Sequence, residues 1–381
     1  MLTMLPARQF SALRLADVLT SSLDAISARP NVLGLPPVHK GVVILADGLG
    51  ASSIRARAGH ARFFSARLNK SSIIDGVFPA TTAAGIATLT TGTPPGQHGL
   101  VGYQVLDRAR DRVVNQLTGW DDGMQPASWQ RARTVFDRAA DENVPSFAIG
   151  PKRFVDSGFT QAVLRGAQYV AADKMADRFT AARSILNDNP TALIYLYVAE
   201  LDVAAHAYGW ESDRWLAVLE NLDSEVSRFA ETLRSDEGLL LTADHGVIDV
   251  PSTRHVLFDT EPALVAGVRH VAGDPRCVQL YLEPAQSAVT ADTLADAWRQ
   301  SESDRAWVYT RAEAVAAGLY GRVADEVLPR IGDVIVAARK AIAYYDSRPA
   351  NQKARGMIGQ HGSLTDEEVR VPLIRAGAFA R

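Results

Sequence analysis

Short, uninterrupted apolar runs rich in β-branched and aromatic residues constrain the fold of this chain more than any other feature. They occupy residues 41–46 (GVVILA), 146–150 (SFAIG), 192–198 (ALIYLYV) and 239–243 (LLLTA). Runs of this length without polar alternation are typical of strands that are buried on both faces, as in parallel sheets. The chain is therefore expected to contain a central, mostly parallel sheet.

The segments between these strands have helical periodicity. In residues 212–235, large apolar side chains recur every three or four positions, at Trp215, Leu219, Leu222, Val226 and Phe229. This spacing predicts an amphipathic helix with one buried face. Strands that alternate with helices indicate an α/β fold.

The pattern changes between residues 251 and 347, where apolar strands surround the helical segment ADTLADAWRQ. We interpret 251–347 as a smaller α/β insertion subdomain, with a strand at 333–339. Residues 1–250 and 348–381 then form the catalytic domain, and the chain returns to the main sheet at VRVPLIRA (369–376). With 381 residues, of which 47% are hydrophobic, the chain can bury a large core without disulfides or structural metal.

Charge and cysteine content exclude several classes of protein. The formal net charge is −3, so no global basic field attracts nucleic acid or an anionic membrane. Cys277 is the only cysteine, which excludes a disulfide framework and a cysteine-based metal cluster. Arg8 and Arg14 interrupt the apolar residues of the N-terminal segment, and no apolar run reaches the roughly 18 residues of a membrane span. We expect a cytoplasmic location, no membrane partner and no stable nucleic acid binding.

Polar residues follow three of the predicted strands directly. Asp47 follows the first and precedes Gly48-Leu49-Gly50, Asp202 and His206 follow the third, and Asp244-His245 follows the fourth. Ligands of open parallel sheets gather at the carboxyl ends of the strands. Taken singly, each of these groups could instead be a turn aspartate, a helix cap or an exposed polar pair. Together they predict a binding site at one edge of the sheet.

The segment FPATTAAGIATLTTGTPPGQHG (78–99) predicts a helix that starts at Thr81 or Thr82. A threonine at this position is commonly an N-cap. A helix N-terminus also favours negative charge, and so could stabilise an alkoxide or a phosphate. The hydroxyl would need a base or a metal to become a nucleophile. His361, which lies between Gly359 and Gly362, is a further candidate, because glycines allow the backbone to approach a site closely.

The charges of these candidates balance as a two-metal site. Two divalent ions bring four positive charges against three carboxylates, which leaves one positive charge for an anionic substrate or an alkoxide. The candidate set consists of Asp47, Thr82, Asp202, His206, Asp244, His245 and His361.

The motifs LADGLG, FPATT…TTGTPPGQHG, ELDVAAH, ADHG and GQHGS occur in this order along the chain. In this respect the chain resembles the alkaline phosphatase superfamily, specifically its nucleotide pyrophosphatase/phosphodiesterase family. The resemblance implies an alkaline-phosphatase-like three-layer α/β/α fold with a mostly parallel central sheet and a smaller insertion. It also implies a hydrolase that cleaves phosphodiester or nucleotide pyrophosphate bonds of small molecules. The reaction would use two divalent metal ions, with zinc as the expected element, and a covalent phospho-threonine intermediate.

The resemblance also implies individual roles. Thr82 occupies the position of the nucleophile, ten residues before Gly92, and would contact one zinc. The implied ligands of that zinc are Asp47, Asp244 and His245, and those of the second zinc are Asp202, His206 and His361.

Substrate contacts are predicted at two tyrosines. Tyr103 stands where family members commonly have an asparagine that holds a phosphoryl oxygen, and its phenol could replace that amide. Tyr208 lies near a motif loop and could stack on a nucleobase or an aryl leaving group, as could Trp120 and Trp210. All three could equally be wall or core residues.

Several rival functions share this chemistry. A phosphomonoesterase or a phosphonate hydrolase would use the same metals, although no arginine or lysine inside the motifs supplies the extra positive charge that a dianionic monoester requires. Cys277 lacks the Cys-x-Pro-x-Arg context of a sulfatase. A phosphosugar mutase rests on fold analogy alone. A non-catalytic nucleotide-binding module is the alternative from a different class, and it predicts binding without turnover.

Overall fold

The central sheet carries the framework of the molecule. The computed structural model describes residues 13–283 and 289–380, so Arg8 of the N-terminal segment lies outside the described residues. Six strands form the sheet in the order β18-β8-β1-β7-β5-β6. All neighbouring pairs are parallel except β18 with β8. The strands are β1 (Lys40–Ala46), β5 (Ser146–Gly150), β6 (Gln168–Ala171), β7 (Ala192–Val198), β8 (Glu237–Thr242) and β18 (Ile374–Gly377).

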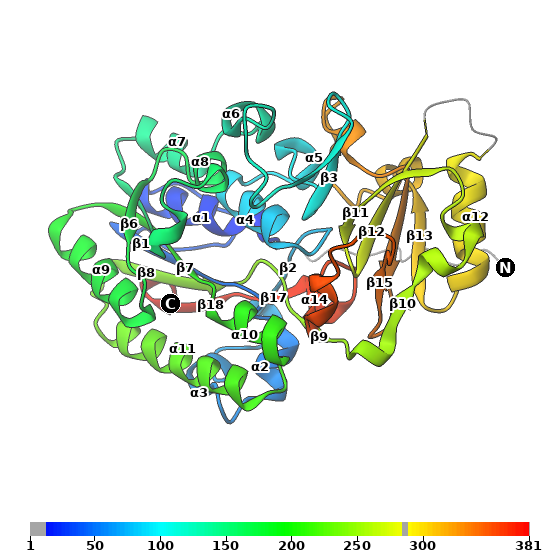
Figure 1. Ribbon diagram of the computed structural model, residues 1–381. Coiled ribbons are helices and arrows are strands. Elements are labelled where there is room, and N and C mark those ends of the chain that lie inside the picture. The colour runs from blue at the N-terminus through cyan, green and yellow to red at the C-terminus, as the bar shows by residue number, and fades with distance from the viewer. Residues whose placement is uncertain (1–12, 284–288, 381) are drawn as a thin grey trace.

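Helices cover both faces of this sheet (Figure 1). One layer comprises α1 (Ala16–Ile26), α4 (Thr82–Thr91), α7 (Val135–Asp141) and α8 (Gly158–Val163). The other comprises α2 (Ala51–Ala56), α3 (Arg62–Ser65), α9 (Met175–Asp188), α10 (Glu200–Tyr208) and α11 (Asp213–Glu231). Every residue of β1 is buried, which explains why its sequence lacks polar alternation. The predicted three-layer α/β/α fold is confirmed.

The amphipathic pattern of residues 212–235 becomes helix α11. Ser212 caps its N-terminus by accepting a hydrogen bond from the backbone N–H of Trp215. The five apolar residues predicted to lie on one face are all buried.

A second sheet stands beside the first and has the strand order β11-β12-β14-β13, with every pair antiparallel (Figure 1). It consists of β11 (Val268–Asp274), β12 (Cys277–Leu282), β13 (Ala306–Thr310) and β14 (Val334–Ala338), and α12 (Ala291–Glu302) packs on it. It has its own core, which includes Phe258, Leu280, Trp298 and Val336. These elements fall inside the range 251–347, whose boundaries as a subdomain stay a prediction.

Short elements connect the two sheets. They are β2 (Ile73–Asp75), β9 (Ile248–Asp249), β10 (His255–Leu257), β15 (Ala343–Tyr345), β16 (Gly359–Gln360), β17 (Arg370–Pro372) and α14 (Asp366–Val369). Further short elements are α5 (Pro95–His98), β3 (Gln104–Asp107), β4 (Arg112–Asn115), α6 (Pro126–Trp129) and α13 (Arg311–Ala316).

The final strand differs from the expectation of one strand over 369–376. The segment splits into β17, which pairs with β2, and β18, which joins the main sheet antiparallel to β8. Pro372 lies at the break, and it has no backbone N–H with which to continue a ladder of hydrogen bonds.

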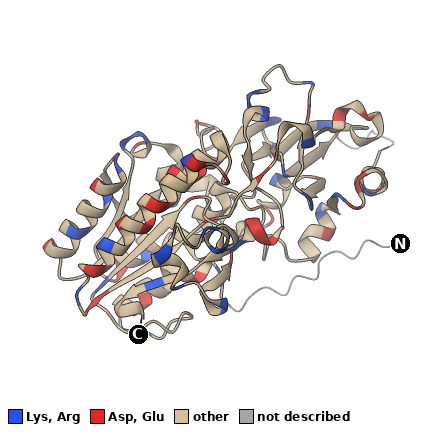
Figure 2. Ribbon diagram, turned by 90° about the horizontal axis from the view of Figure 1, so that it is seen from below, with Lys and Arg blue, Asp and Glu red and all other residues tan. Residues whose placement is uncertain are grey.

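Charged residues of both signs are interspersed over both parts of the molecule (Figure 2). Within residues 13–283 and 289–380, no helix is sufficiently long and apolar to cross a bilayer.

Candidate active site

The candidate ligands meet at the carboxyl edge of the central sheet because each follows a strand that ends there. Asp47 comes directly after β1, and Gly48 turns the chain with φ +73°. Helix α10 begins two residues after β7 and carries Asp202. Residues 244 and 245 leave the end of β8, and His361 follows β16, which pairs with β9 just beyond. The fold therefore joins residues that lie more than three hundred positions apart in the sequence.

Helix α4 distinguishes the two threonines at its start. The hydroxyl of Thr81 is engaged as the N-cap and accepts a hydrogen bond from the backbone N–H of Ala84. Thr82 is the first helical residue, and its Oγ1 lies 3.2 Å from Nε2 of His245. Of the two hydroxyl groups, that of Thr82 contacts the candidate ligands.

A glycine allows this helix to lie against the end of β8. A Cβ atom placed on Gly85 would come within 2.5 Å of Cβ of Asp244 and within 3.0 Å of its backbone oxygen. Any side chain at position 85 would therefore push the helix that carries Thr82 away from Asp244.

One group of candidate ligands comprises Asp47, Asp244 and His245, all of them buried. Nε2 of His245 lies 3.4 Å from Oδ1 of Asp47 and 3.6 Å from Oδ2 of Asp244. The other oxygen of Asp47 accepts a hydrogen bond of 2.5 Å from the hydroxyl of Tyr197. The second oxygen of Asp244 accepts the backbone N–H groups of Gly48 and His245. One oxygen of each carboxylate is thus fixed by the protein, and the other is left near His245.

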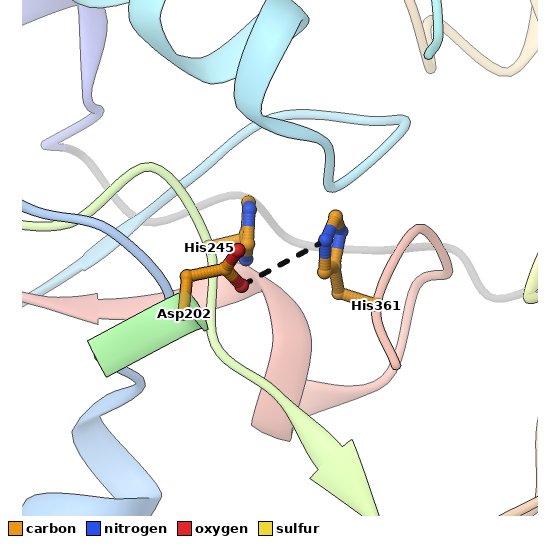
Figure 3. Close-up of side chains that lie close together, drawn as sticks. All are labelled: Asp202, His245 and His361. Carbon is orange, nitrogen blue, oxygen red and sulfur yellow. Dashed lines mark ion pairs between the residues drawn. The ribbon is translucent and has the colours of Figure 1, made fainter. Parts of the chain in front are cut away.

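A second group comprises Asp202, His245 and His361 (Figure 3). The carboxylate of Asp202 points toward His361, with 4.0 Å between Oδ1 and Nε2. The rings of His245 and His361 stack with centroids 3.7 Å apart. His206, four residues beyond Asp202 on α10, places Nε2 3.2 Å from Oδ2 of Asp202. His245 thus belongs to both groups, whereas His206 reaches the cluster through Asp202.

All three histidines are held by the same kind of contact. Nδ1 of His206 lies 2.7 Å from the carbonyl oxygen of Gly359, and Nδ1 of His361 lies 2.8 Å from that of Ala80. Nδ1 of His245 lies 3.2 Å from the carbonyl oxygen of Gly246. A carbonyl oxygen can only accept, so each Nδ1 carries the proton and each Nε2 is available as a lone-pair donor when the ring is neutral. Histidine ligands of metals are commonly oriented in this way.

The carboxylates leave buried acceptors unsatisfied. Oδ1 of Asp47, Oδ1 of Asp202 and Oδ2 of Asp244 are buried and have no hydrogen-bond partner among the described residues. Burial, together with the carboxylates of Asp244 and Asp202, raises the pKa of Asp47 well above its ordinary value. Burial also raises the pKa of Asp244. Three unsatisfied carboxylate oxygens facing free imidazole nitrogens form a donor set that suits divalent cations.

The imidazoles differ in protonation. Burial lowers the pKa of His206, but the attraction of the Asp202 carboxylate outweighs it and raises the pKa to about 9. Burial and the neighbouring His245 lower the pKa of His361 well below its ordinary value. In the cation-free protein at neutral pH, His206 is therefore protonated and His361 is neutral.

A cavity of about 450 Å³ adjoins Thr82, and Tyr197, whose hydroxyl donates to Asp47, also lines it. Its walls are largely apolar and aromatic, and come from the segment after β4, the loop and helix after β5, strand β6 and strand β7. The lining includes Leu117, Trp120, Phe154, Phe159, Tyr169, Tyr195 and Tyr197. Arg153 also lines it; its guanidinium lies 4.7 Å from the centroid of the Phe154 ring.

The residues predicted to bind substrate lie in different places. Trp120 lines the cavity, whereas Tyr103, Tyr208 and Trp210 do not. Tyr208 is 46% exposed and stacks under the guanidinium of Arg214. The substrate-binding roles of Tyr103 and Tyr208 stay predictions.

Two residues with evident positions in the site were missed from the sequence. Tyr197 was treated only as part of an apolar strand, although alternate tyrosines in a fully buried run signal hydroxyl groups that need partners. Arg153 follows β5, a strand to which no motif had been assigned. The carboxyl end of that strand was the available signal.

Comparisons with known proteins identify the family and the relatives that this chain resembles. The family model of type I phosphodiesterase / nucleotide pyrophosphatase matches residues 41–364. An uncharacterized pyrophosphatase/phosphodiesterase of Schizosaccharomyces pombe is 21% identical over 191 residues, which cover 48% of this chain and 39% of the yeast protein. The match therefore spans less than half the length of that relative.

Solved structures show the same fold. Murine ectonucleotide pyrophosphatase / phosphodiesterase 5, as an inactive threonine-to-alanine variant in complex with AMP, has a TM-score of 0.69 at 16% identity. The alignment covers 89% of this chain and 88% of the murine chain. The human protein of the same name has a TM-score of 0.68 at 15% identity, with the same coverage.

Proposed function

Because the chain belongs to the type I phosphodiesterase / nucleotide pyrophosphatase family, we propose that it hydrolyses phosphodiester or nucleotide pyrophosphate bonds with Thr82 as the nucleophile and two divalent cations, expected to be zinc. The observation that carries the proposal is the contact between the Thr82 hydroxyl and His245, which belongs to a largely buried cluster of three carboxylates and three imidazoles. The relative from Schizosaccharomyces pombe bears a name of this activity.

The residues of the cluster fit cations. Asp47, Asp244 and His245 would hold one cation, and Asp202, His206 and His361 the other. The unsatisfied oxygens of the three carboxylates support this assignment, as do the hydrogen bonds at Nδ1 of the three histidines, which leave Nε2 as the ligand atom of each neutral ring. Bound cations would neutralise the carboxylates, lower the pKa of the Thr82 hydroxyl and stabilise negative charge on phosphoryl oxygens.

Thr82 is placed to perform the covalent step. Its oxygen attacks phosphorus in line and forms a P–O bond while the bond to the leaving oxygen breaks, which gives a phospho-threonine and an alcohol or a nucleotide. Water then attacks the phospho-threonine, releases the phosphoryl product and restores the hydroxyl. The N-terminus of α4 faces the anionic group in both steps, and its partial positive charge favours the developing negative charge.

The cavity beside Thr82 supports an organic leaving group or nucleoside portion. Aromatic walls formed by Trp120, Phe154 and Tyr169 suit a flat ring, which stacks on such side chains with little sequence-specific hydrogen bonding. A small-molecule substrate such as a nucleotide fits this volume. The murine protein of the same fold was solved with AMP.

One observation favours a phosphomonoesterase as a second candidate. Arg153 provides a fixed positive charge in the cavity lining, and a dianionic monoester benefits from such a charge. A phosphonate hydrolase would share this requirement. The two readings differ in what Arg153 contacts: the phosphoryl group itself in a monoesterase, or a second anionic group of the substrate in a diesterase.

A substrate panel tests the proposal. Zinc-loaded protein is assayed with bis-aryl phosphate, mono-aryl phosphate, a dinucleotide polyphosphate, a nucleoside triphosphate and a cyclic nucleotide, and kcat/KM is compared. A preference for bis-aryl phosphate or the dinucleotide supports the proposed function. A preference for the mono-aryl ester that is lost in Arg153→Gln establishes the monoesterase. Tight nucleotide binding with no turnover of any compound would leave only a binding module.

A further inference from the structure

We propose that the tip of the β11–β12 hairpin, through Arg276, positions the loops that carry His361 and His245, so that the second sheet is part of the metal centre. The tip consists of residues 274–277, between and including the ends of the two strands. The inference rests on the proposed function only for the role of the two histidines as ligands. It assigns a task to the insertion that neither the motifs nor the cavity explains.

Arg276 makes a fully buried, two-pronged ion pair with Glu368 of α14. Nε and Nη2 of Arg276 each donate to a different carboxylate oxygen at 2.8 Å, and both residues are 0% exposed. Nη1 donates at 2.8 Å to the backbone carbonyls of Lys340 and Ile342, which follow β14. One guanidinium therefore joins the second sheet to α14, which lies between the two sheets in Figure 1.

Glu368 in turn contacts both of the loops that carry His361 and His245. Its Oε1 accepts the backbone N–H of Ser363 at 2.9 Å, two residues after His361. Its backbone carbonyl accepts the N–H of Gly246 at 2.8 Å, one residue after His245. The same residue thus fixes one amide in each loop, and Arg276 fixes its carboxylate.

Other contacts hold the hairpin tip against the loop that follows His361. Gly362 has φ +130°, and a Cβ atom there would lie 3.1 Å from Cβ of Asp274. The hydroxyl of Ser363 donates to the carbonyl of Ala338 at the end of β14, at 2.6 Å. The loop after His361 is therefore packed against the second sheet on several sides.

The guanidinium is required by geometry as well as by charge. A planar fork can serve two carboxylate oxygens and two carbonyls at once, whereas the ammonium of lysine is a point charge that cannot reproduce this arrangement. Arg276→Lys keeps the buried positive charge next to Glu368 and removes the fork. This variant avoids leaving an unpaired buried carboxylate, which would endanger folding.

The chain offers a matched control far from the histidines. Arg183 makes a two-pronged ion pair with Glu237, with both contacts at 2.8 Å and Glu237 0% exposed. Glu237 begins β8, at the end of the strand opposite His245. Arg183→Lys therefore weakens a two-pronged pair to a buried glutamate, although Arg183 itself is 20% exposed, without touching the loops.

The experiment measures three quantities on full-length wild type, Arg276→Lys and Arg183→Lys. These are the melting temperature, the zinc affinity by competition with a chelator, and the hydrogen exchange of segments 359–365 and 244–247 in metal-free protein. We expect Arg276→Lys to lower zinc affinity by about tenfold, the usual scale for residues that orient ligands. We also expect Arg276→Lys to speed hydrogen exchange in both segments. Arg183→Lys should change neither zinc affinity nor exchange, although it lowers the melting temperature by a similar amount.

Each outcome decides the inference. If both variants change zinc affinity and hydrogen exchange equally, Arg276 contributes only to general stability and the proposal is overturned. It is also overturned if Arg276→Lys changes neither zinc affinity nor exchange. If wild type binds zinc but hydrolyses no phosphodiester, the proposed function fails while the zinc and exchange results still judge Arg276. If wild type binds no zinc, the metal centre itself is refuted, and faster exchange only in Arg276→Lys still establishes the positioning of the loops.

Discussion

Thr82 adjoins two chemically different regions. One is a polar cluster of three carboxylates and three imidazoles, most of them buried, whose members are fixed by hydrogen bonds to backbone groups and to Tyr197. The other is a cavity with mostly apolar walls, whose residues come from several separate segments. Under the proposed function, the polar cluster would carry the chemistry, where an error in geometry is costly, and the cavity would select the substrate through its shape and the charge of Arg153. Substitutions in the polar cluster should therefore affect catalysis and metal binding, whereas substitutions in the cavity should affect KM.

The largest effect is expected at the boundary between the two regions. Thr82→Ala removes the only hydroxyl that contacts His245 among the described residues, so kcat should fall by roughly 10³-fold or more. Zinc content by elemental analysis should stay near that of wild type, because six other ligands remain. Thr81→Ala is the control and should lose only the helix cap, about 1 kcal/mol of stability. Full activity in Thr82→Ala would assign the nucleophile elsewhere.

A variant within the polar cluster should act through the metal. His361→Ala removes one imidazole of the second group, and we expect the occupancy of one cation to drop, with zinc affinity lower by roughly 10²-fold. Elemental analysis after dialysis measures the stoichiometry. His255→Ala, outside the cluster, serves as the control. Two zinc ions retained in His361→Ala would remove His361 from the ligand set.

Competition between protons and zinc should be detectable at the histidines of the polar cluster and not in the cavity. The pKa of His206 is about 9 in the cation-free protein, so zinc must displace a proton from this imidazole at any pH below that value. Zinc affinity should therefore rise with pH up to about 9, by up to tenfold per unit for this one proton, and then level off. His361, whose pKa is lowered, adds no slope in this range. Chelator competition at pH 7, 8 and 9 measures it, and equal affinities at pH 7 and 8 would contradict the coupling to Asp202.

The smallest effect is expected in the cavity. Trp120→Ala removes one aromatic wall, and the loss of stacking should raise KM for aryl or nucleotide substrates by about tenfold while kcat changes little. Tyr208→Ala is a matched control, since this aromatic side chain is exposed and lies outside the cavity lining. A larger rise in KM for Tyr208→Ala than for Trp120→Ala would indicate that the substrate binds at the face near Arg214 instead of in the cavity.

The sequence predicted the polar side better than the cavity. Asp47 and Asp244 come at the ends of buried strands and Asp202 lies four residues after one, so one rule about strand ends was enough to group them. The α/β fold and the enzyme family inferred from the ordered motifs are confirmed. Identification of Thr82 rested on the resemblance, because helix-start patterns do not distinguish a cap from its neighbour.

The cavity could not be predicted in the same way. Phe154, Phe159 and Tyr169 belong to a short 3-10 helix, a short α-helix and an edge strand, and nothing in their spacing reveals that they face one space. The division of 369–376 into two strands likewise depends on which partner each half meets. Such features arise from tertiary packing, which local patterns do not encode.

Gly85 sets how closely helix α4 can approach the segment that follows β8. Because this residue has no side chain, α4 rests directly against Asp244. The separation between the main chain at Thr82 and the Asp244 carboxylate is therefore limited by van der Waals contact at Gly85, and even a single methyl group at this position would widen it.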